Sequence, residues 1–172
     1  MLLLLSTAVT CAERRRDPLT QAEAEQLRAV AAHPYKRLNL YVRFTRARLD
    51  SIDRLRSDPK SAEGRGRKIH DLLEDFTAIM DEINDALDQY AGRPLSESDR
   101  KDFHKGLREV IEASDKFDLK LRKLQSAKEA DPQPKKEAAD YQFALQDAQD
   151  ALKSTADMAR EYLTEKDSNQ KK

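Results

Sequence analysis

The sequence is poor in the residues that mark turns, cross-links and β-structure. Its 172 residues include four glycines, six prolines, one cysteine and no tryptophan. A single cysteine excludes a disulfide scaffold, and so few glycines exclude a collagen-like chain or a glycine-rich linker. A β-sandwich would need many more turn residues and β-branched runs than this chain contains.

The chain also lacks a net charge. Its 32 basic residues balance 32 acidic ones, so there is no electrostatic reason to expect general binding to nucleic acid or to a membrane surface. Charged residues nevertheless make up 37% of the sequence and hydrophobic residues 38%, and the charged share is well above that of an average globular domain. We therefore predict no nucleic-acid partner.

The first twelve residues, MLLLLSTAVTCA, carry no charged side chain, and basic residues follow within two positions. An apolar run of about 11 residues is too short for a transmembrane helix, which needs about 20. It fits a secretory signal peptide, with the small residues Thr10 and Ala12 three and one positions before the cleavage site. We predict a signal peptide at 1–12, a linker at 13–19, and a mature chain that is exported and has no transmembrane helix. The alternatives are a buried N-terminal helix and a lipoprotein anchor at Cys11.

Helix-breaking residues gather in three short stretches, at 58–66, 92–94 and 131–134. Strong helix formers fill the segments between these stretches. The pattern predicts four long helices and one short helix before them. Their expected ranges are 20–32, 34–57, 67–91, 97–128 and 135–167.

Each long segment carries apolar residues at intervals of three and four, which is the period of an amphipathic helix. The segment 97–128 shows it most regularly, at Phe103, Leu107, Val110, Ser114, Phe117, Leu121 and Leu124. Stripes near 3.5 residues per turn favour helices that cross at about 20°. We predict an all-α, antiparallel up-down-up-down four-helix bundle at 20–167, with an additional short N-terminal helix and a disordered tail at 168–172.

Two of the expected helices carry opposite charge. The segment 34–57 has seven basic and two acidic residues, whereas 67–91 has seven acidic and two basic residues. Because a short loop joins them, they should run antiparallel and pair. The expected ion pairs are Arg48 with Asp75, Arg43 with Asp81 or Glu82, and Arg37 with Asp88.

The sequence carries no recognisable catalytic motif. It has no nucleophile elbow, no glycine-rich phosphate loop and no C-x-x-C-H haem attachment motif. We therefore predict no catalytic residue, no enzyme activity and no cofactor, and we assign the chain to no family.

His70 and Glu74 are one helical turn apart, a spacing that metal ligands use. A metal- or small-ligand-binding bundle, with a further carboxylate from a neighbouring helix, is our alternative to a solvated His–Glu pair.

The segment 34–44 combines three aromatic and three basic residues. Its Leu40 and Phe44 lie one turn apart and off the main apolar stripe, so something other than the bundle core should cover them. The short helix at 20–32 is one candidate cover. The other is an interaction with another protein or with an acidic ligand. For the chain as a whole, the expected partner is another protein or a second copy of this chain. We predict an interaction surface around Tyr35, Arg37, Leu40 and Phe44, and a non-catalytic protein-interaction or scaffolding role in the periplasm or outside the cell.

Overall fold

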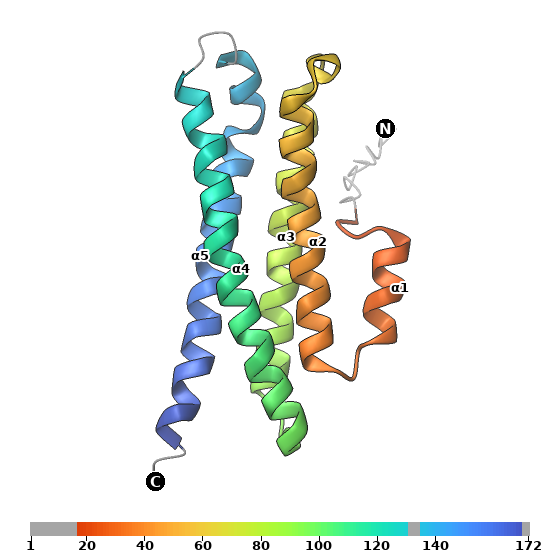
Figure 1. Ribbon diagram of the computed structural model, residues 1–172, viewed down its shortest axis with the longest axis vertical. Helices are drawn as coiled ribbons and strands as arrows, with labels where there is room; N and C mark the ends of the chain where they lie inside the picture. The colour runs from red at the N-terminus through yellow and green to blue at the C-terminus, as the bar shows by residue number, and fades with distance from the viewer. Residues whose placement is uncertain (1–16, 131–134, 170–172) are drawn as a thin grey trace, which may run out of the picture.

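The computed structural model describes residues 17–130 and 135–169, and this part of the chain contains helices but no strand (Figure 1). The helices are α1 (Gln21–Ala29), α2 (Pro34–Ser57), the 3-10 helix η1 (Pro59–Ser61), α3 (Arg65–Ala91), α4 (Glu97–Ala130) and α5 (Lys135–Asn169). The predicted all-α class is therefore confirmed. The predicted signal peptide at 1–12, residues 13–16 of the linker and residues 170–172 of the tail lie outside the described residues. Residues 168 and 169, predicted as tail, belong to α5.

Local sequence signals start the helices where they were expected. Thr20 and Glu23 form a capping box at α1, in which the Glu23 amide donates to the Thr20 hydroxyl at 3.2 Å. Pro34 occupies the first turn of α2, where its missing N–H costs no hydrogen bond. α1 ends at Ala29, three residues earlier than predicted, and His33 has an extended backbone. A residue before proline is disfavoured in the helical region, so a short link separates the two helices.

The chain direction alternates from α2 to α5, which confirms the predicted up-down-up-down bundle (Figure 1). The helices that pack together are α2 with α3, α2 with α4, α3 with α5, and α4 with α5. Lys120 of α4 binds Asp50 of α2 at 2.8 Å, and Arg65 of α3 binds Glu137 of α5 at 2.8 Å. Lys120 and Asp50 both lie in the C-terminal halves of their helices, so α2 runs parallel to α4. Arg65 and Glu137 both lie at the N-terminal ends of theirs, so α3 runs parallel to α5. The link at 92–96 therefore crosses the end of the bundle.

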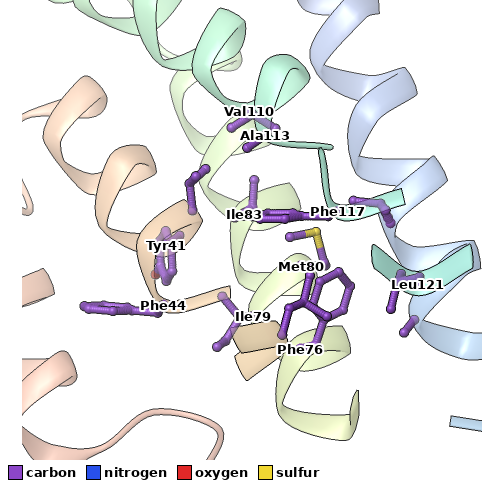
Figure 2. Close-up of a cluster of buried hydrophobic side chains, with 14 of the residues drawn as sticks. Tyr41, Phe44, Phe76, Ile79, Met80, Ile83, Val110, Ala113, Phe117 and Leu121 are labelled. Atoms are coloured by element: carbon purple, nitrogen blue, oxygen red, sulfur yellow. The ribbon is translucent and has the colours of Figure 1, made fainter. Parts of the chain in front are cut away.

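The core is one apolar cluster, and each long helix contributes a stripe of residues to it. Figure 2 shows its centre, where Phe76 and Phe117 meet edge to face with ring centroids 6.0 Å apart and Met80 packs beside them. Burial of this surface stabilises the fold at about 25 cal/mol for each Å² of apolar area. The polar residues Thr45, Ser114 and Thr155 are also buried, and each donates its hydroxyl to the carbonyl four residues earlier in its own helix. These three hydroxyls therefore need no partner from another helix.

Two glycines mark places where helix backbones come close. A Cβ on Gly106 of α4 would lie 2.6 Å from Leu38 Cδ1 of α2, so the two helices come close at this glycine. The stretch 58–66 was expected to lie outside the long helices, and for Arg65 and Gly66 this prediction is wrong. The turn residue is Gly64, whose φ is +65°, whereas Gly66 lies inside α3 and is buried against α5. A Cβ on Gly66 would lie 2.7 Å from the backbone oxygen of Glu137.

These contacts predict different costs for two Gly→Ala substitutions. Gly66→Ala should lower the free energy of unfolding by about 1–3 kcal/mol, because the α5 backbone has to move away. Gly106→Ala should be close to neutral, since the Leu38 methyl group can rotate away and alanine gains about 1 kcal/mol of helix propensity over glycine. Urea unfolding followed by circular dichroism measures both values. A Gly66→Ala chain as stable as the Gly106→Ala chain would contradict the tight α3–α5 contact.

Candidate functional site

The flank of α2 that carries Leu40 and Phe44 is occupied by α1. α1 lies alongside α2 (Figure 1), and Leu27 of α1 joins the core cluster. Figure 2 shows the Phe44 ring turned away from the centre of the core, yet this residue is 4% exposed. Arg43 stacks over the Phe44 ring at 5.5 Å from the ring centroid and also donates a hydrogen bond to Gln26 of α1. The cover that the sequence suggested for this flank is therefore in place.

The four residues of the predicted interaction surface do not form one open patch. Phe44 is buried, and the half-buried Leu40 packs against the core cluster. Tyr35 lies toward α4, where the Lys105 ammonium is 4.0 Å from its ring centroid. Arg37 lies toward α3, where it donates to Gln89 at 3.1 Å. Positions 35 and 37 are about 200° apart around a helix of 3.6 residues per turn, so a stretch that is continuous in sequence is divided between two flanks.

Arg48 is the centre of the polar contacts that hold α1. It is 8% exposed, and its two Nη atoms donate to the carboxylate oxygens of Glu23 at 2.6 and 2.7 Å. Nη2 also donates to the Pro18 carbonyl at 2.5 Å, and Nε lies 3.8 Å from Asp75 of α3. One guanidinium therefore joins α1, the residues before it, α2 and α3. Bidentate arginine–carboxylate pairs of this kind are among the stronger polar contacts in proteins.

Glu23 does two things at once. Its carboxylate accepts the Thr20 amide in the capping box at 2.8 Å and accepts two bonds from Arg48. The hydrogen bond from Arg48 is the main reason that the pKa of this carboxyl falls to about 2, against an ordinary value of 4.5. The sequence gave no sign of this ion pair, because Arg48 is 25 residues away from Glu23 and the angle between α1 and α2 is not encoded locally.

The predicted ion pairs between α2 and α3 are found in part. Arg48 and Asp75 come within 3.8 Å, as expected. Arg37 reaches Gln89, the residue after its expected partner. Arg43 turns to α1 instead of α3, and Glu82 accepts a hydrogen bond from the Tyr41 hydroxyl at 3.1 Å. Burial is the main reason that the pKa of Tyr41 is raised. Complementary charge thus predicts which helices pair better than it predicts which side chains meet.

His70 and Glu74 come together on the outside of α3. His70 Nδ1 lies 3.7 Å from Asp71 Oδ1 and 3.8 Å from Glu74 Oε2, and one donor atom from each residue lies within 4.8 Å of the others. The third group is a neighbour in the same helix, not the carboxylate from another helix that was expected. The His70, Asp71 and Glu74 side chains are 36%, 45% and 65% exposed. A transition-metal site needs ligand distances near 2 Å, so these side chains would have to change rotamer to hold an ion.

The Arg48–Glu23 pair predicts a specific change in titration. Arg48→Met should raise the pKa of the Glu23 carboxyl from about 2 toward 4.5, because the main hydrogen-bond donor to the carboxylate is lost. Arg43→Met removes a neighbouring arginine that binds Gln26 and should leave this pKa near 2. NMR titration of the Glu23 carboxyl measures both values.

Because the folded pKa lies below the ordinary one, the stabilisation from Glu23 should be complete above about pH 4.5 and should disappear as the pH falls toward 2. An unchanged Glu23 pKa in the Arg48→Met chain would contradict this assignment of the shift.

Within residues 17–130 and 135–169, no helix combines the length and apolar character needed to cross a membrane. Comparison with protein-family models, with curated proteins and with solved structures finds no match to this chain. A function therefore has to be inferred from the residues of this chain and their geometry.

Proposed function

We propose that this chain is a non-catalytic protein-interaction or scaffolding protein that acts outside the cytoplasm. The observation that carries the proposal is the use of its polar groups. Catalysis needs an acid, base or nucleophile held in a concave, water-poor site with a free reactive atom. Two carboxyl groups of the described residues have a lowered pKa, and each is engaged by a basic side chain. Glu23 binds Arg48 between helices, and Glu112 binds Lys116 one turn away on the surface of α4. Polar side chains here serve mainly to hold helices together, and the surface is left for binding.

The location rests on the N-terminal sequence. An uncharged segment of twelve residues, followed within two positions by arginines, is typical of a secretory leader. The lone cysteine, Cys11, lies within that segment. A mature chain that begins after Ala12 therefore has no thiol to oxidise, which suits folding in an oxidising compartment.

Tyr35 and Arg37 are the parts of the predicted surface that we expect a partner to contact. Both are half-buried, like Leu40, but Leu40 packs against the core cluster whereas Tyr35 and Arg37 extend to the two sides of α2. Tyrosine and arginine are enriched at the energetic centres of protein interfaces because they offer a large contact area together with hydrogen bonds. A partner that lies across the start of α2 would contact both side chains.

The double variant Tyr35→Ala/Arg37→Glu tests this surface. We expect it to lower the capture of a cross-linked partner from an extracytoplasmic extract at least tenfold, with the helix content unchanged. The matched control is Phe143→Ala on α5, which removes an aromatic side chain that is 79% exposed. Equal capture by both variants and the unaltered chain would count against the surface at Tyr35 and Arg37.

Metal binding is the second candidate function, favoured by the proximity of His70, Asp71 and Glu74. If the interaction proposal is correct, we expect well under one zinc ion per purified chain by elemental analysis after zinc loading and buffer exchange. The control variant is His33→Ala, which removes a histidine outside α3. One zinc per chain that is lost in His70→Ala and retained in His33→Ala would favour the metal-binding function instead.

A further inference from the structure

α1 is held in place by a small number of contacts. It has nine residues, and Leu27 is the buried one among them. Isolated helices shorter than about 12–15 residues are marginal in water, so α1 depends on its contacts to stay helical. Among the described helices its packing is mainly with α2. Elements with few buried contacts open at a lower free energy than the whole fold, and α1 fits that description.

The flank of α2 beneath α1 has a defined chemistry. Leu40, Phe44 and Arg48 follow one another at intervals of four, so they form a strip along one face. Arg43 lies at the edge of this strip over the Phe44 ring. We call these four residues the seat. When α1 is absent, the described ion-pair partner left to Arg48 is Asp75, at 3.8 Å from Nε. The seat therefore favours a segment that brings both a carboxylate and an apolar side chain.

α1 shows which spacing fits the seat. Thr20 caps the helix, Glu23 follows three residues later and binds Arg48, and Leu27 follows after four more residues and joins the core cluster. Gln26 meets Arg43 while Glu23 meets Arg48, so α1 runs antiparallel to α2. The pattern is a hydroxyl cap, a carboxylate at the third position after it and a leucine one turn further on.

We propose that α1 is a displaceable strap, and that the seat binds an acidic amphipathic helix of a partner protein with this same spacing. The partner's carboxylate replaces Glu23 on Arg48, and its leucine replaces Leu27 in the core cluster. Helices that lay an apolar face into a groove are a common mode of recognition, read through anchors three, four and seven residues apart. The inference rests on the proposed function, because it names a second binding surface and the kind of partner for that function.

A strap that competes with the partner has a measurable consequence. The apparent affinity of the seat is reduced by the fraction of molecules in which α1 is detached. A change that weakens α1 but leaves the seat intact should therefore raise the affinity by the same factor as it raises that fraction. Amide hydrogen exchange at residues 21–29 measures the fraction, and peptide binding measures the affinity, so the two can be compared directly.

The test uses the full chain and a synthetic peptide of residues 17–31, acetylated, amidated and carrying a fluorophore. We expect the Leu27→Ala chain to bind this peptide at least tenfold more tightly than the unaltered chain by fluorescence anisotropy. Adding Arg48→Met to the Leu27→Ala chain should abolish the gain, whereas adding Arg100→Met, an exposed arginine on α4, should not. A peptide with Glu23→Lys and a scrambled peptide should bind neither chain.

Several results would overturn the proposal. Equal binding to the unaltered and Leu27→Ala chains would mean that α1 does not compete, and binding that survives Arg48→Met would place the peptide elsewhere. If the unaltered chain forms a dimer and the peptide dissociates it, the seat binds α1 of a second copy and not a helix of another protein. If Leu27→Ala also lowers the urea concentration at which the whole bundle unfolds, the Glu23→Gln chain replaces it in the test. Glu23→Gln weakens the strap with a smaller change in side-chain volume.

The peptide-binding experiment and the capture experiment test different claims, so failure of the strap can be distinguished from failure of the proposed function. Loss of peptide binding together with normal capture through Tyr35 and Arg37 would reject the strap and leave the proposed function standing. Tight peptide binding to the Leu27→Ala chain, together with loss of all capture in extracytoplasmic extracts, would reject the proposed function. When both hold, the Leu27→Ala chain should also capture more partner than the unaltered chain, and the peptide should compete with that capture.

Discussion

The structure depends on the burial of one apolar stripe from each of the four long helices in a common core. This burial is non-directional and scales with area, so it fixes the bundle without any particular polar contact. The buried hydroxyls of Thr45, Ser114 and Thr155 donate hydrogen bonds within their own helices and need no hydrogen-bond partner from a neighbouring helix. As a result, the charged side chains are free to set other properties: which helices pair, where α1 lies and what the surface can bind.

The opposite charges of α2 and α3 illustrate this division. Exposed ion pairs contribute between about 0 and 1 kcal/mol each, too little to hold the fold but enough, taken together, to favour one pairing of helices over another. Arg48 is different because it is buried and makes a bidentate contact with Glu23. Its removal would leave a carboxylate without its partner in a water-poor place, which is costly. The carboxyl with a large pKa shift in the described residues is therefore the one that attaches α1, the shortest of the described α-helices.

The sequence predicted what local periodicity can encode. The stripe of Phe103, Leu107 and Phe117 and the helix break before Pro34 depend on residues a few positions apart, and the structure has both as expected. Features set across the bundle could not be predicted in this way. The burial of Gly66 against α5 is one of them, because the residues that meet there are about 70 positions apart.

The same dependence on contacts between distant residues explains why the four residues of the predicted interaction surface do not form one patch. Tyr35, Arg37, Leu40 and Phe44 looked like one surface because they are close in sequence, but a helix turns by about 100° per residue and distributes them around its axis. Each side chain then meets a different neighbour: α4 at Tyr35, α3 at Arg37 and the covered flank at Phe44. An aromatic and basic stretch on a helix should therefore be divided by face before a function is assigned to it. Divided in this way, α2 has two half-buried side chains beside its neighbours and one strip covered by α1, and a partner could use that strip only if α1 were displaced.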